Sequence, residues 1–273
     1  MRGNLYIVAT PIGNLEDITL RALRVLREVD LIAAEDTRHS LKLLNHYGIE
    51  KPLISYWSER EKVRSEEIIN LLKAGKSVAL ISDAGTPGIS DPGAVLISRA
   101  IQEGITVIAI PGPSALIAAL SISGLPAQEF LFCGFLPPKR ADRIRKLETL
   151  KFEKRTIVLY EAPHRILESV DDMKKVFGPE RRAAIIKELT KIHEEVLRGT
   201  LEELYSKLLE SVIAGEYVII VEGGAEKPLT MEEALEEVKV LMKQGMGRKE
   251  AVKTVAEHYN ISSKELYDRS LKT

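Results

Sequence analysis

The sequence predicts an α/β protein with two consecutive α/β domains and a small C-terminal helical extension. Apolar strand-like runs alternate with helical periodicity through the first 110 residues, and several of these runs end in turns rich in glycine and proline. After residue 227 the pattern becomes helical only, which predicts the extension. Alternation of this kind is typical of a mostly parallel sheet with helices on both faces.

The first domain is expected over residues 1–112. Short apolar runs predict its strands, and apolar residues at helical spacing, ended in several cases by a glycine, predict its helices. The strands are expected at 5–9, 31–34, 53–56, 77–81 and 105–110. The helices are expected at 17–29, 39–47, 61–73 and 93–103.

The second domain is expected over residues 113–226, and short late links predict a mixed sheet. Its strands are expected at 130–136, 156–160, 183–187 and 217–222, and its helices at 115–122, 165–176 and 200–209. The stretch 105–127 carries no charge and is long enough to span a membrane. Because Pro111-Gly112-Pro113 interrupts it, we expect a buried strand, a turn and a buried helix instead.

The extension is expected over residues 227–273. Three short helices, beginning near 230, 248 and 262, are similar to a helix-turn-helix. Eight basic residues against four acidic ones within 239–273 permit nucleic-acid binding, and a packing or dimer arm is the alternative. The same tail leaves open a non-enzymatic nucleic-acid-binding regulator as a function for the chain.

Composition restricts the classes of site. The formal net charge is −1, so any nucleic-acid contact must come from a local patch. Cys133 is the single cysteine and the five histidines lack metal-ligand spacing, so we expect no disulfide framework and no metal. Segment 139–155, which includes Arg143, Arg145 and Lys146, holds eight basic residues against three acidic ones. It suits phosphate contacts, and an ordinary exposed helix is the alternative.

Three turns predict a ligand cleft. The turns 9–15, 82–93 and 111–115 each follow a predicted strand, and no dinucleotide or P-loop glycine motif is present. In open α/β sheets, ligands bind at the carboxyl ends of the strands. Glycine and proline there let the backbone approach a ligand closely.

Charged residues gather in further turns after strands. Glu35, Asp36, Arg38 and His39 follow the second predicted strand, where Asp36 could alternatively cap the next helix. In the second domain, 160–165 and 187–194 are charged turns of the same kind.

Residues 5–19, 34–38, 82–88, 111–115 and 160–165 carry a close resemblance to the tetrapyrrole (corrin/porphyrin) methylase superfamily, in particular to members that methylate small-subunit ribosomal RNA. The resemblance covers 4–226, and the tail from 228 is similar to the extension of many members. It implies the tetrapyrrole methylase fold, with S-adenosylmethionine in a cleft between two α/β domains. It also implies a cytoplasmic homodimer, free of metal and membrane, that methylates the ribose 2′-hydroxyl of a cytidine in the decoding region of 16S rRNA in the small ribosomal subunit. A methyltransferase acting on a small tetrapyrrole is the alternative within the superfamily.

The resemblance also implies site residues. The expected cofactor contacts are Pro11, Asp83, Ala84, Gly85, Thr86, Ile89, Ser114, Ala115, Tyr160, Glu161, Ala162 and Leu189. Where the superfamily has a Gly-Asp-Pro loop, this chain has Gly85-Thr86-Pro87, so the acid is displaced to Asp83. A protonated ribose hydroxyl is a poor nucleophile, so we expect a general base among Asp36, Glu35 and Glu188. Arg38, His39 and Lys187 are expected near the acceptor phosphates.

Overall fold

Two compact units make up the chain in a computed structural model, which describes residues 2–224, 231–259 and 261–271. The larger unit is Met1–Glu148 with Arg155–Glu222, and the smaller is Thr149–Lys154 with Gly223–Thr273. The boundary expected at 226/227 falls within 225–230, outside the described residues. Because both sheets belong to the larger unit, the boundary expected at 112/113 stays a prediction.

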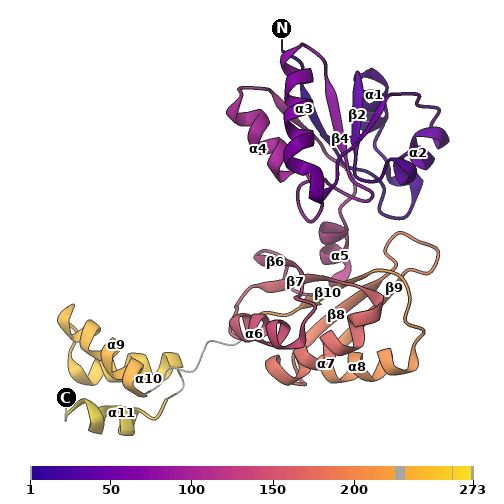
Figure 1. The fold of residues 1–273 in the computed structure, drawn as a ribbon. Coiled ribbons are helices and arrows are strands. Elements are labelled where there is room, and N and C mark those ends of the chain that lie inside the picture. Colours follow the sequence, from indigo (N-terminus) through magenta and orange to yellow (C-terminus); the bar gives the residue numbers. More distant parts are fainter. Residues whose placement is uncertain (1, 225–230, 260, 272–273) are drawn as a thin grey trace. The chain divides into compact units, whose positions relative to one another are not determined.

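The first sheet is fully parallel, with the strand order β3-β2-β4-β1-β5 (Figure 1). Its strands are β1 (Leu5–Val8), β2 (Leu31–Ala34), β3 (Leu53–Ser55), β4 (Val78–Ile81) and β5 (Val107–Ile110). All four residues of β4 are buried, because this strand has a neighbour on each side and helices on both faces. The predicted parallel α/β architecture is confirmed for this half.

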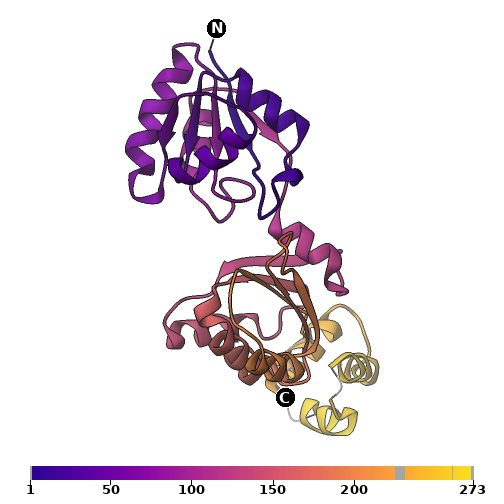
Figure 2. The ribbon, with the colours of Figure 1, turned by 90° about the vertical axis from the view of Figure 1, so that its right-hand side faces the viewer.

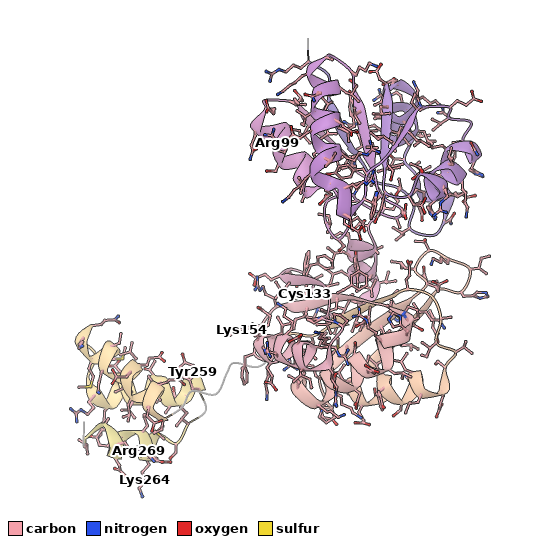
Figure 3. All side chains as sticks on the ribbon, viewed as in Figure 1. Arg99, Cys133, Lys154, Tyr259, Lys264 and Arg269 are labelled. Carbon is pink, nitrogen blue, oxygen red and sulfur yellow. The ribbon has the colours of Figure 1, made fainter. Side chains whose placement is uncertain are left out.

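Helices cover both faces of the first sheet. On one face α1 (Leu20–Glu28) and α2 (Thr37–His46) share a core with Ile32 and Ala34. On the other face α3 (Glu61–Lys73) and α4 (Ala94–Gln102) share a core with Ala33, as the alternation of side chains along a strand requires. Arg99 lies on the outer side of α4 and pairs with Glu66 of α3 at 2.8 Å (Figure 3).

The second sheet is mixed, as predicted, with the strand order β6-β7-β10-β8-β9. Its strands are β6 (Phe130–Phe135), β7 (Thr156–Glu161), β8 (Arg182–Lys187), β9 (Glu195–Thr200) and β10 (Tyr217–Val221). Only β6 and β7 pair in parallel, whereas the other pairs are antiparallel. Strand β9 was not among the expected strands. It is a half-exposed edge strand that pairs only with β8, so it lacks the apolar run that marks the others.

Four helices accompany the second sheet: α5 (Ala115–Ser123), α6 (Arg140–Leu150), α7 (Ile166–Phe177) and α8 (Leu201–Glu210). Helix α5 packs on β8 and β10, and α7 and α8 lie together on the opposite face (Figures 1 and 2). The uncharged stretch 105–127 divides into β5 and α5, as expected. Among the described helices, none combines the length and apolar character that crossing a membrane requires.

The smaller unit contains α9 (Met231–Lys243), α10 (Arg248–Tyr259) and α11 (Ser263–Ser270). Its own apolar core includes Ala234, Val252 and Leu266, and Tyr259 donates a hydrogen bond to Glu237 at 3.3 Å (Figure 3). The three predicted helices of the extension are therefore present.

Candidate active site

The three glycine- and proline-rich turns meet at one edge of the first sheet. Thr10 and Gly85 exchange two backbone hydrogen bonds of 2.9 and 3.0 Å. The Thr10 hydroxyl donates to the carbonyl of Ser82 at 3.0 Å, and the Thr86 hydroxyl donates to the carbonyl of Pro113 at 3.4 Å. These bonds join the turns after β1, β4 and β5 into one surface, as the sequence predicts.

Glycine is required in these turns for two different reasons. Gly85 has φ +78°, a left-handed conformation that residues with a side chain rarely adopt. Gly112 instead needs space, because a Cβ there would lie 3.0 Å from the Cβ of Ala9. The first glycine sets the direction of the chain, and the second allows two turns to approach.

A cavity of about 360 Å³ opens where these turns face the second sheet within the larger unit. This volume suits a small-molecule ligand. The structure brings ten of the twelve expected cofactor residues to its lining: Ala84, Gly85, Thr86, Ile89, Ser114, Ala115, Tyr160, Glu161, Ala162 and Leu189. Pro11 and Asp83 do not line it. Pro11 is buried beside the lining residue Ile12, and the Asp83 carboxylate accepts a hydrogen bond from the backbone of Asp36 at 3.1 Å.

Tyr160, at the end of β7, builds much of the second wall. Its ring makes edge-to-face contacts with Phe132 and Phe135, at centroid distances of 5.0 and 5.7 Å. Its hydroxyl accepts a hydrogen bond from the backbone N–H of Leu116 at 3.1 Å, and burial raises its pKa. The neutral phenol thus joins β7 to the first turn of α5, whose N-cap is Ser114.

The charged residues of the lining are all acidic. Among the described residues, the lining contains three carboxylates, Asp91, Glu161 and Glu216, and neither lysine nor arginine. Glu161 is buried, accepts hydrogen bonds from Ser169 at 2.6 Å and from the Ala162 backbone at 2.9 Å, and pairs with Arg165 at 2.6 Å. A ligand that is apolar and cationic suits such a lining better than a phosphate does.

Several lining residues were not predicted from the sequence, among them Ile12, Ser90, Asp91, Phe135 and Tyr217. Ile12, Ser90 and Asp91 lie inside the turns that were singled out, so the turns themselves were the available signal. Phe135 is the last residue of β6, and its position at a strand end was the signal that could have placed it at the cleft. Tyr217 begins β10, and its place at the cavity depends on antiparallel pairing with β7 and β8, which periodicity does not reveal.

In the charged turn after β2, Asp36 caps a helix and Glu35 is half-buried. Asp36 is the N-cap of α2, as the alternative interpretation had it, and its carboxylate accepts the Arg38 backbone N–H at 2.8 Å. Hydrogen bonds from Arg38 lower the pKa of Asp36. Glu35 is half-buried and accepts the Asp83 N–H at 3.4 Å, and burial raises its pKa. Arg38 and His39 are exposed.

Glu188 holds the turn after β8. Both it and Thr190 have positive φ values, 51° and 67°, which place the lining residue Leu189 between two strained positions. The Glu188 carboxylate accepts hydrogen bonds from Lys191 at 2.8 Å and from the Glu216 backbone at 3.0 Å, and the bond from Lys191 lowers its pKa. Lys187 donates to the carbonyl of Val212 at 2.7 Å. None of the three expected bases, Asp36, Glu35 and Glu188, lines the cavity.

The basic segment folds into α6, and its placement corrects one expectation. Arg143 is fully buried and pairs with Asp172 at 2.9 Å and Glu168 at 3.0 Å, both on α7. It joins two helices and is not available for phosphate contacts. Arg145 and Lys146 are exposed, so they keep the place on the surface that phosphate contacts need. Within the described residues, no cluster of histidine, cysteine, aspartate and glutamate is arranged to hold a metal ion.

Comparisons with known proteins agree on one family. The family model described as tetrapyrrole (corrin/porphyrin) methylases matches residues 4–205. A protein of Halalkalibacterium halodurans named ribosomal RNA small subunit methyltransferase I is 46% identical over 98% of this chain and 94% of its own. A Thermotoga maritima protein of the same name is 49% identical over 81% of this chain and 99% of its own. A solved structure of uroporphyrin-III C-methyltransferase from Thermus thermophilus, complexed with S-adenyl homocysteine, shares the fold. It has a TM-score of 0.56 and 19% identity over 80% of this chain and 97% of that one.

Proposed function

Because the chain belongs to the tetrapyrrole methylase family and, within it, to the ribosomal RNA small subunit methyltransferase I group, we propose that it transfers a methyl group from S-adenosylmethionine to small-subunit ribosomal RNA. The observation that carries the cofactor assignment is the cavity at the three joined turns, lined by apolar residues and carboxylates. When bound, S-adenosylmethionine supplies an electrophilic methyl group on a positively charged sulfur.

The lining residues fit that cofactor. Ser114 and Ala115, at the start of α5, lie in the lining, where the positive end of the helix dipole would favour the amino-acid carboxylate. The turn at Ala84, Gly85 and Thr86 offers small side chains and close backbone, and the wall at Tyr160 and Leu189 offers apolar contact for the adenosine. Much of the acceleration of an in-line displacement comes from alignment, which these joined turns can supply.

The acceptor we propose is the 2′-hydroxyl of a cytidine ribose in the decoding region of 16S rRNA. Support comes from the family resemblance and from basic side chains that stay on the surface of the larger unit. Arg38 and His39 are exposed at the start of α2, and Arg145 and Lys146 are exposed on α6. Lysine and arginine on a surface suit RNA phosphates.

Of the three expected bases, only Glu35 has a raised pKa, whereas Asp36 and Glu188 are held ionised by cations.

We also infer, from the resemblance alone, a homodimer that works in the cytoplasm. A tetrapyrrole substrate has less support, because the uroporphyrin enzyme is 19% identical whereas the ribosomal RNA relative is 46% identical. A non-enzymatic regulator would leave the cavity at the three turns without a use.

Two measurements test the proposal. Calorimetry with S-adenosylhomocysteine should show one site per chain, and absence of binding would remove the cofactor assignment. Methyl transfer to a small-subunit RNA should disappear when the target cytidine carries deoxyribose, because the accepting oxygen is missing. The methylated linkage should resist alkaline cleavage, since the hydroxyl that attacks the phosphate is blocked. Methylation of a deoxyribose target would point to a base instead.

A further inference from the structure

Asp91 is the one carboxylate that the first half of the larger unit contributes to the cavity lining. Of the other two lining carboxylates, Glu161 is held by Arg165 and Ser169, and Glu216 pairs with Lys191 and has a side chain 77% exposed. No ion pair joins Asp91 to a lysine or arginine in the described part of the chain. It therefore remains free to exchange a proton with a ligand.

The loop that carries Asp91 is fixed at both ends. Its start is held by the paired backbones of Thr10 and Gly85, and its end by a 2.7 Å hydrogen bond from the Gly93 N–H to the Glu61 carboxylate. In the middle, Gly88 has φ +79° and packs against Gly93, where a Cβ would lie 3.0 Å from the Gly88 nitrogen. Asp91 is thus held in place before a ligand arrives, which is what a reacting group needs.

The groups around Asp91 come from three elements. The Ser82 hydroxyl lowers the pKa of Asp91, and the negative charge of Asp83 raises it. The charge of Asp91 raises the pKa of Glu35, in the turn after β2, and that of Tyr160, at the end of β7. Burial is the largest influence and raises the pKa of Asp91. Asp91 and Tyr160 both line the cavity, so the carboxylate and the phenol face the same space.

We propose that Asp91 is the catalytic base that accepts the proton of the ribose 2′-hydroxyl. This inference rests on the proposed function. As the acceptor oxygen forms its bond to the methyl carbon, the bond between that carbon and the donor sulfur breaks and its electron pair stays on sulfur. The hydroxyl proton moves to a carboxylate oxygen of Asp91, which later releases it to water.

Position and charge separate Asp91 from the three bases predicted by sequence. Asp36 caps α2 and is paired with Arg38, and Glu188 is bound by Lys191. Both are poor proton acceptors, because their cationic partners favour the ionised form. Glu35 is half-buried and does not line the cavity. Among these carboxylates, Asp91 alone both faces the cavity and lacks a cation.

The test compares Asp91→Asn with the wild type in the full chain, with Asp171→Asn on α7 as the matched control. We expect the single-turnover rate of Asp91→Asn to fall by about 10² to 10⁴, the usual contribution of a general base. Its affinity for S-adenosylhomocysteine should stay within about threefold of the wild type, a tolerance of roughly 0.65 kcal/mol. Asp171→Asn should match the wild type in both, because its partner is Lys175.

A pH series and NMR give readouts that a structural role would not move. The wild-type rate should fall with acidification through the pKa of Asp91, and Asp91→Asn should lack this inflection. Carboxyl carbon NMR of the ligand-free protein should show an aspartate titrating above 3.8, the ordinary value, and that signal should vanish in Asp91→Asn. Asp91→Glu, which keeps a carboxylate, should be slow but retain the inflection.

Each outcome decides the matter. A wild-type rate in Asp91→Asn, or a loss explained entirely by weaker S-adenosylhomocysteine binding, overturns the role of Asp91 and leaves the proposed function intact. A wild-type enzyme that methylates no ribose hydroxyl overturns the proposed function, and the role of Asp91 with it.

Discussion

Replacing Arg143 by methionine should destabilise the larger unit rather than weaken RNA binding. The arginine is buried between α6 and α7, where its guanidinium donates to Asp172 and Glu168. Methionine removes the charge and keeps much of the volume, so the Asp172 carboxylate, 1% exposed, loses its buried partner.

The magnitude follows from what remains around Asp172. Breaking a buried pair by removing one partner costs about 3–5 kcal/mol. Asp172 keeps one hydrogen bond, from Arg140 at 3.1 Å, and the Arg140 side chain is 62% exposed. Because this contact survives, we expect the lower end, about 3 kcal/mol. With a urea m-value of about 3 kcal/mol/M, the unfolding midpoint should fall by about 1 M.

The assay is urea unfolding of the full chain, followed by a fluorescence or circular dichroism signal of the larger unit. Arg145→Met, exposed on the same helix, is the control and should change the free energy of unfolding by less than about 0.5 kcal/mol. Adding Asp172→Leu to Arg143→Met should recover part of the loss, because an apolar pair no longer buries a lone charge. A stable Arg143→Met protein with weakened RNA binding would refute this reasoning.

Four further predictions test other parts of the chain. Ala115→Leu should fill the cavity and weaken S-adenosylhomocysteine binding more than tenfold by calorimetry, whereas Ala118→Leu, on the same helix but outside the lining, should bind normally. Reversing Arg145 and Lys146 to glutamate should weaken RNA binding and flatten its dependence on salt, and an unchanged slope would return them to an ordinary solvated face. Gly48→Ala and Gly215→Ala both place a side chain at positive φ, and each should lower the free energy of unfolding in urea by about 1–2 kcal/mol. Gly215→Ala should lose more, because its Cβ would overlap the Glu188 carboxylate while Gly48 has open space, and equal losses would contradict the placement of Glu188. The pKa of Glu188 is lowered in the folded protein, so the ionised carboxylate stabilises the fold above about pH 4.5. This stabilisation is lost as the pH falls through the pKa of Glu188 in the folded protein. Glu188→Gln should therefore lose less stability than the wild type between pH 5 and 3.

The strands and helices were largely predictable, because buried faces require apolar residues at the spacing of a strand or a helix. The expected helix at 61–73 has the same bounds in the structure, and the buried strand β4 is a continuous apolar run. Helix α2 begins at Thr37, two residues earlier than expected, because Asp36 provides the cap. Strand β9 escaped prediction because an edge strand needs little apolar character.

Side-chain roles were predictable only where local spacing determines them. Arg143 shares a face with Leu147 and Leu150, both buried, at helical spacing, and that pattern could have indicated its burial. Its positive charge within a basic segment indicated an exposed side chain instead. Asp91 stands in a Ser-Asp-Pro-Gly turn that reads as ordinary turn chemistry. Its place at the cavity depends on contacts between turns far apart in the chain, which no local pattern encodes.

The position of β10 at the centre of the second sheet determines when that sheet can form during synthesis. The first sheet has all its strands once residue 110 has left the ribosome, since β5 is its last strand. The second sheet lacks its middle until Tyr217–Val221 emerges, so β7 and β8 wait with unpaired edges. Such edges bind other strands, including those of neighbouring nascent chains. A ribosome that stalls between about residues 187 and 217 therefore holds a chain whose first sheet is complete and whose second sheet still has unpaired strand edges. Translation speed across that interval should govern the yield of folded protein.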